Sequence, residues 1–217
     1  MKVVLITYLK KDFDKKLAEI FVREGYKVYA AGSQQINGIT QLPSDLKEAA
    51  LIIQKESCLI DIYIDVSDEQ SPQDNFNIRS GLNIQVIQEL YQANVIQQMA
   101  MLEAFFPLLE AGKGKRLCYL TSAQASINET RDTEGYGYKM AKAGLHNFIQ
   151  ITRNVLAPKN YSFRIFDPVL KEIPAEKSAE AAYNYITRGR GIEQGDLYRD
   201  DENNIVFRDA YGRQHSW

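Results

Sequence analysis

The chain has 217 residues, a length that favours one domain, with two small domains as the alternative. Hydrophobic residues make up 45% and charged residues 25%, which is usual for a globular protein and excludes a disordered or coiled-coil chain. A formal net charge of −2 leaves no basic surface for a phosphate backbone, so we expect no nucleic-acid partner. No apolar run reaches the ~18 residues of a membrane span, so we expect no membrane association.

Cysteine and histidine are too few for a structural zinc site, which needs four suitably spaced ligands. The candidates are Cys58, Cys118, His146 and His215, scattered along the chain. We therefore expect no metal site and two buried, reduced thiols, as in a cytoplasmic protein. The apolar start of the chain becomes polar at Thr7, too early for a signal peptide, and predicts a first strand instead.

Strands and helices alternate along the chain. Apolar residues at helical or strand spacing predict strands at 3–7, 26–31, 59–66, 116–121 and 161–166, and helices at 12–24, 46–53, 84–109, 137–155 and 175–186. Gly25 predicts the end of the first helix, and a polar loop is expected over 67–77. The long segment 84–109 is predicted as one helix or as two that meet near Asn94.

This alternation predicts a doubly wound α/β fold, in which helices cover both faces of a parallel sheet in three layers, α/β/α. We expect a single domain, with a core over 1–188 and a C-terminal extension over 189–217. The extension is polar, with short strand-like pieces such as 204–208, and its packing is not determined by the pattern.

Tyr138 and Lys142 stand four residues apart at the start of the helix predicted at 137–155. This spacing places the phenol and the ammonium group one turn apart on one helix face. A neighbouring cation favours the phenolate, so it should lower the tyrosine pKa from about 10 toward neutrality and prepare the side chain for proton transfer. With 13 tyrosines in the chain, the spacing alone is weak evidence.

The surroundings of the pair strengthen the prediction. Ser122 follows the strand at 116–121, and Asn94 lies in the long helix. With the segments 120–130 and 135–147, these residues resemble the short-chain dehydrogenases/reductases, in particular the branch related to C-factor and sniffer carbonyl reductases. The resemblance covers most of residues 1–186. It implies a Rossmann-like fold and an oxidoreductase that uses NAD or NADP on a small carbonyl or alcohol.

The resemblance also implies roles for individual residues. Tyr138 would be the general acid/base, and Lys142 would tune it and bind the nicotinamide ribose. Ser122 would hold the substrate oxygen, and Asn94 would support a proton-relay water. Thr7 and Pro168 match further cofactor-binding positions.

The glycine-rich turn of that family, Thr-Gly-x-x-x-Gly-x-Gly, is absent. Thr7 matches, but Tyr8, Asp12 and Asp14 occupy the three glycine positions. Glycine permits a tight turn and close approach to the diphosphate, whereas Asp12 or Asp14 would cap the helix and place a carboxylate at the phosphate position. Three further segments differ from the pattern of that family. Residues 30–33 carry neither an acid nor an arginine, and residues 42–44 read Leu-Pro-Ser. Residues 65–68 read Asp-Val-Ser-Asp where the family has Asn-Asn-Ala-Gly.

Three hypotheses about function follow. The first is an NAD(P)-dependent oxidoreductase of a small carbonyl or alcohol. The second is a non-catalytic dimeric module that binds a small-molecule ligand or regulates a partner and has lost the dinucleotide. The third is a cofactor-independent lyase or isomerase that uses the same tyrosine, because proton transfer alone needs no nicotinamide. The resemblance also implies a homodimer or homotetramer that pairs through its two long helices.

Overall fold

The computed structural model describes residues 1–32, 36–188 and 206–216. Ser33, Trp217 and the first two residues of the strand-like piece at 204–208 lie outside these ranges. So does most of the predicted C-terminal extension, and the boundary expected at residue 188 therefore stays a prediction.

The described residues form one sheet with the strand order β3-β2-β1-β4-β5-β6-β7-β8. Strands β1 to β7 pair in parallel, and β8 runs antiparallel to β7. Because the chain leaves β1 in one direction for β2 and β3 and in the other for β4 and the rest, β1 and β4 border the point where the strand order reverses. The bounds are β1 Val3–Leu9, β2 Lys27–Gly32, β3 Ile39–Leu42, β4 Ile62–Asp65, β5 Arg116–Leu120, β6 Ser162–Asp167, β7 Phe207–Asp209 and β8 Gln214–His215.

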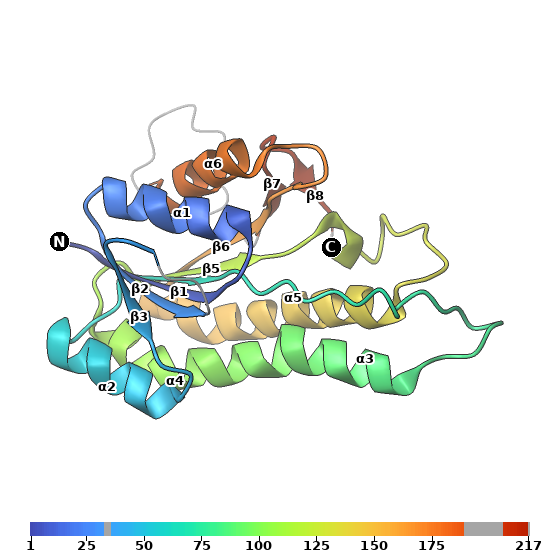
Figure 1. Cartoon of the computed structure of the whole chain (residues 1–217), viewed down its shortest axis with the longest axis horizontal. Coiled ribbons are helices and arrows are strands. Elements are labelled where there is room, and N and C mark those ends of the chain that lie inside the picture. The colour runs from blue at the N-terminus through green and yellow to red at the C-terminus, as the bar shows by residue number, and fades with distance from the viewer. Residues whose placement is uncertain (33–35, 189–205, 217) are drawn as a thin grey trace.

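Helices cover both faces of this sheet, which confirms the predicted three-layer α/β fold (Figure 1). On one face lie α1 (Asp12–Arg23) and α6 (Ala175–Thr187), which pack against each other. The other face carries α2 (Leu46–Glu56), α3 (Ile84–Tyr91), α4 (Gln97–Ala111) and α5 (Tyr136–Leu156). A π-helical turn, Gln92–Ile96, joins α3 to α4, so the long predicted helix is continuous.

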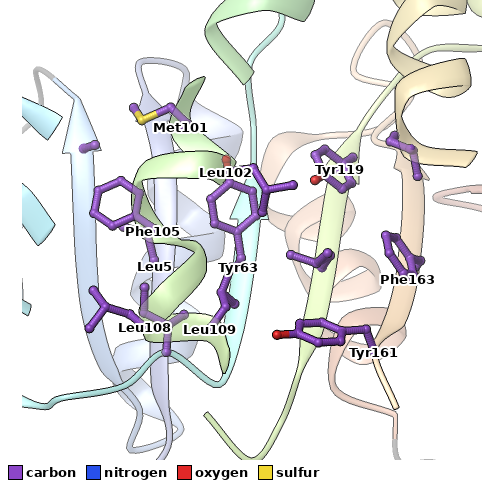
Figure 2. Close-up of a cluster of buried hydrophobic side chains, with 14 of the residues drawn as sticks. Leu5, Tyr63, Met101, Leu102, Phe105, Leu108, Leu109, Tyr119, Tyr161 and Phe163 are labelled. Carbon is purple, nitrogen blue, oxygen red and sulfur yellow. The ribbon is translucent and has the colours of Figure 1, made fainter. Parts of the chain in front are cut away.

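Alternation along the strands divides the core in two. In β1, Val4 and Ile6 pack toward α1 and α6, whereas Val3 and Leu5 pack toward α4 and α5. Figure 2 shows Leu5 facing the α4 side chains on the second face. Because β1 is buried on both sides, its sequence is a continuous apolar run.

The structure corrects several sequence predictions. Strand β3 was not predicted, because Ile39–Leu42 is short and only half-buried at the sheet edge. The helical spacing of 137–155 would also place Met140 and Ile151 in the core, but they are 53% and 58% exposed in α5. Helical spacing identifies apolar positions but not the partner that covers them.

Neither Cys58 nor Cys118 forms a disulfide, and the expectation that both are buried is wrong for Cys58, which is exposed after the end of α2. Cys118 is buried in β5. In the part of the chain that the structure describes, no helix has the length and apolarity to cross a membrane. Those same residues contain no group of three or more His, Cys, Asp or Glu side chains placed to hold a metal ion.

The C-terminal segment extends the sheet. Strand β7 pairs with β6, and β8 turns back on β7. His215 lies between the carboxylates of Glu129 and Asp209, 3.1 Å from each. The end of the chain is thereby attached to the segment that follows Ser122.

Candidate functional site

The candidate residues gather at the carboxyl ends of β1, β4, β5 and β6, where ligands bind in sheets of this topology. Thr7 lies at this end of β1, in register with Ala31 on one side and Asp65 on the other. Ser122 follows β5 and Pro168 follows β6. Helix α5 brings Tyr138 and Lys142 to the same edge, because Lys142 contacts the carbonyl oxygen of Ser67 just after β4.

Lys142 is fully buried and Tyr138 is 5% exposed. The Lys142 ammonium donates to the carbonyl oxygen of Ser67 at 2.7 Å and lies 5.8 Å from the centre of the Tyr138 ring. The pair predicted from its spacing is therefore formed and enclosed. A buried ammonium needs acceptors and a counter-charge to remain ionised.

That counter-charge is Asp68, a residue to which sequence reasoning gave no role beyond replacing a glycine. Its Oδ1 accepts a 2.5 Å hydrogen bond from the Tyr138 hydroxyl and lies 3.4 Å from the Lys142 ammonium. Its Oδ2 lies 2.5 Å from the ammonium of Lys11. One carboxylate therefore contacts three groups that belong to the β1–α1 turn and to α5.

Burial raises the pKa of Tyr138 well above its usual value, and the Asp68 carboxylate raises it further, while the side chains of Gln70 and Ser122 offset only part of this. The expectation that Lys142 would bring this pKa toward neutrality is therefore wrong for this arrangement. Burial likewise lowers the pKa of Lys142, and Asp68 and Asp65 oppose that change. The tyrosine is held as a neutral proton donor.

The start of α5 is fixed by another carboxylate that the sequence analysis did not identify. Asp74, from the loop after β4, accepts hydrogen bonds from the backbone N–H groups of Gly137 at 3.0 Å and Tyr138 at 2.8 Å. A negative group at a helix N-terminus satisfies free N–H groups and complements the helix dipole. A Cβ at Gly137 would lie 2.8 Å from the end of the Leu90 side chain and 3.3 Å from both carboxylate oxygens of Asp74, so a larger residue would crowd this cap.

Asn94 lies in the π-helical turn and is fully buried. Its amide group bonds the backbone of Glu69 twice, accepting from the N–H at 3.1 Å and donating to the carbonyl oxygen at 2.9 Å. It also donates to the carbonyl oxygen of Leu90 at 3.0 Å. Asn94 therefore positions the segment that carries Asp68, and its predicted support of a proton-relay water stays a prediction.

Ser122 caps a short 3₁₀ helix, Ala123–Ala125, where its hydroxyl accepts from the N–H of Gln124 at 3.3 Å. Asp167 supports this segment from β6, since its Oδ2 accepts from the N–H of Ala123 at 2.7 Å. Ser122 therefore lies just after β5, at the same edge of the sheet as Tyr138, and its predicted hold on a substrate oxygen stays a prediction.

The turn between β1 and α1 keeps a glycine-like backbone without glycine. Tyr8 adopts a φ of 60°, a left-handed conformation that costs a residue with a side chain about 1–2 kcal/mol. Its hydroxyl donates to the Gln97 side chain of α4 at 3.2 Å. Burial raises the pKa of Tyr8 to about 12, and the charges of Asp65 and Glu69 add to this effect.

Asp14 occupies the anion position at the N-terminus of α1. Its Oδ2 accepts from the backbone N–H groups of Lys10 at 2.9 Å and Lys11 at 2.8 Å. The prediction that an aspartate would take these groups is confirmed for Asp14, while Asp12 is exposed. Burial raises the pKa of Asp14 to about 6, against the opposing effect of the two N–H donors and the Lys11 charge.

The remaining cofactor positions give a mixed result. Tyr8, Gly32, Pro43 and Met101 are among the residues around a mostly apolar cavity of about 430 Å³, on the side where the resemblance implies the adenine. Near the opposite end, the carbonyl oxygen of Pro168 accepts from the Ser178 hydroxyl at 2.6 Å, and the next residue, Val169, has a φ of 49°. Val169 therefore adopts a glycine-like backbone where the resemblance implies Pro-Gly.

These observations test whether a dinucleotide fits. The N–H groups that would meet the diphosphate are bonded to Asp14, and the tyrosine and lysine that would meet the nicotinamide end are bonded to Asp68. NAD or NADP does not fit this arrangement of the residues.

No protein-family model matches this sequence, and no curated protein matches it. Solved structures do match over the whole chain. The carbonyl reductase Sniffer of D. melanogaster superposes with a TM-score of 0.81 at 14% identity, covering 100% of both chains. A carbonyl reductase from Pseudomonas aeruginosa PAO1 in complex with NADP gives 0.75 at 20% identity, also over 100% of both chains.

The NADPH-bound carbonyl reductase from chicken fatty liver gives a TM-score of 0.78 at 13% identity, again covering 100% of both chains. At these identities the likeness concerns the backbone, and it agrees with the strand order and the layers described above. The chain therefore has the fold of the short-chain dehydrogenases/reductases.

Proposed function

We propose that this protein is an oxidoreductase of the short-chain dehydrogenase/reductase kind that acts on a small carbonyl or alcohol compound. The observation that carries the proposal is the enclosed pair of Tyr138 and Lys142, beside Ser122, at the carboxyl edge of the sheet. The fold shared with carbonyl reductases supports it.

Within this proposal, Tyr138 is the acid that delivers a proton to a carbonyl oxygen. Its raised pKa keeps the hydroxyl protonated at neutral pH, and Ser122, just after β5 at the same edge of the sheet, is the residue that would hold the same oxygen. Lys142 provides a positive charge that favours the phenolate left after transfer. Asn94 contributes by holding the backbone of Glu69.

Reduction also needs a hydride donor, and in this fold NAD or NADP is the expected cofactor, with Thr7, Lys142 and Pro168 as the positions that would meet it. Because the dinucleotide does not fit while Asp14 and Asp68 hold their places, we assign only the proton transfer to named residues.

The test is reduction of a panel of small aldehydes, ketones and diketones by the full chain with NADPH or NADH. We expect turnover that falls at least 100-fold in Tyr138→Phe, the scale of a lost general acid. Tyr136→Phe is the matched control, because that ring stacks on Phe76 and lies two residues away on the same helix. Equal rates in wild type and Tyr138→Phe would contradict the assignment.

A second candidate, a non-catalytic module that binds a small molecule or regulates a partner, is favoured by the two carboxylates that fill the cofactor positions. It predicts no turnover with any member of the panel. It also predicts that Tyr138→Phe keeps the biological activity of the wild type, measured by complementation of a deletion strain. Loss of complementation in Tyr138→Phe, with Tyr136→Phe unaffected, would exclude it.

We also propose that two copies associate through the outer faces of α4 and α5. Met99, Ile151 and Val155 are 43%, 58% and 61% exposed there and border an apolar depression of about 590 Å³. Ile151→Glu should convert a dimer or tetramer to a monomer in light scattering, whereas Leu51→Glu on α2, at a position 51% exposed, should not. A wild-type monomer at micromolar concentration would contradict this proposal. Two cysteines without a disulfide are consistent with the cytoplasmic location that we propose.

A further inference from the structure

Asp68 joins two parts of the site that a dinucleotide would have to separate. Lys11 reaches it from the β1–α1 turn, with its ammonium 2.5 Å from Oδ2 and 2.8 Å from the backbone carbonyl oxygen of Asp68. Tyr138 and Lys142 reach Oδ1 from α5. The adjacent ion pair between Lys10 and Glu69 involves neither Tyr138 nor Lys142.

The segment that carries Asp68 is held firmly. The side chain of Asn94 bonds the N–H and the carbonyl oxygen of Glu69, and Lys142 bonds the carbonyl oxygen of Ser67. These contacts fix the backbone on both sides of Asp68. The Asp68 side chain itself is 21% exposed and that of Lys11 is 41% exposed, so this ion pair lies at the solvent end of the site and its partners can exchange.

The carboxylate stays ionised at neutral pH. Burial by itself would raise the pKa of Asp68, but the charges of Lys142 and Lys11 lower it below its usual value. An entering anion therefore meets two ammonium groups that are already neutralised. The backbone N–H groups of Lys10 and Lys11 are not available to the anion either, because they already donate to the Asp14 carboxylate.

We propose that Asp68 is an intramolecular competitor of the dinucleotide. Its carboxylate occupies the Lys142 ammonium and the Tyr138 hydroxyl, which the resemblance places at the nicotinamide end of a dinucleotide, and it also holds Lys11, whose backbone N–H lies at the diphosphate position. The site therefore accepts NADPH or NADH only when Asp68 has released these groups. The inference rests on the proposed function, because it concerns access to the same site.

The experiment measures NADPH and NADH binding to the full chain by isothermal titration calorimetry at fixed salt, in wild type and three variants. Asp68→Ala removes the carboxylate, and Asp68→Asn keeps the side-chain size without the charge. Glu69→Gln is the matched control, because it removes a neighbouring charge that contacts Lys10 but neither Tyr138 nor Lys142. We expect Kd to fall at least tenfold in Asp68→Ala and at least threefold in Asp68→Asn, and to change less than twofold in Glu69→Gln.

Equal affinities in wild type and both Asp68 variants, including no detectable binding in all of them, would overturn the proposal. So would a decrease in Kd in Glu69→Gln as large as that in Asp68→Asn, since that would show a general charge effect. The proposed function can fail separately. Tighter NADPH binding in Asp68→Ala without turnover of any carbonyl supports the competitor and rejects the oxidoreductase, and turnover with an unchanged Kd does the reverse.

Discussion

The buried His146 should make the protein unstable in mild acid. Its Nε2 lies 2.5 Å from the Thr121 hydroxyl, its ring contacts Phe207, and it is 4% exposed. Burial, together with the nearby charge of Lys142, lowers its pKa to about 4 from 6.5. The unfolded chain therefore binds a proton near pH 6.5 that the folded chain accepts only near pH 4.

The stability that this neutral imidazole contributes is complete above pH 6.5 and is lost as the pH falls toward 4. A pKa difference of about 2.5 at about 1.4 kcal/mol per unit gives a loss of roughly 3 kcal/mol between pH 7 and pH 4, of which roughly 2 kcal/mol is lost by pH 5. In His146→Asn, which cannot titrate in this range, this part of the pH dependence should disappear.

Urea denaturation of wild type and His146→Asn at several pH values between 7 and 4.5 measures the difference. Asp14 also makes the free energy of unfolding depend on pH, but in the opposite direction to His146. Because burial raises its pKa to about 6, its contribution to stability falls as the pH rises from about 4 to about 6. Asp14 is present in both proteins, so the difference between them isolates His146. A wild-type minus variant difference that does not change with pH would refute the assignment of a neutral, buried imidazole.

Four further stability predictions can be checked by urea denaturation at pH 7. Asp61→Ala should lower the free energy of unfolding by roughly 3 kcal/mol, because the buried carboxylate accepts from three backbone N–H groups, at the start of β1 and just before β5, that would lose their partner. Gly112→Ala should cost about 3 kcal/mol or more, since a Cβ there would lie 1.9 Å from the carbonyl oxygen of Ile60. Gly25→Ala, at a φ of +81° with open space around it, should cost only about 1 kcal/mol. Val169→Gly should stabilise the protein by up to about 1 kcal/mol, because a β-branched residue at a φ of 49° is strained; a loss of stability would contradict this.

From residue 3 to residue 187, apolar spacing predicts every strand and helix in order except β3, because that spacing reflects what a sheet with two covered faces must bury and β3 is only half-buried at the edge. The sequence by itself identified Tyr138 and Lys142, which share one helix face. It also predicted that a carboxylate would take the phosphate position at the N-terminus of α1. This contact is local in the chain, because an acidic residue in the first turn of a helix can accept hydrogen bonds from the N–H groups just before it, and Asp14 does so.

The contacts of Asp68 and the pKa of Tyr138 followed only from the tertiary structure. The partners of Asp68 come from residues 57 and 70 positions away and meet only because parallel strands end at one edge of the sheet. The lysine spacing predicted a lowered tyrosine pKa, but burial and the Asp68 charge raise it. Local spacing fixes which groups lie on one helix face, whereas the pKa of each group depends on all nearby charges and on how deeply the group is buried.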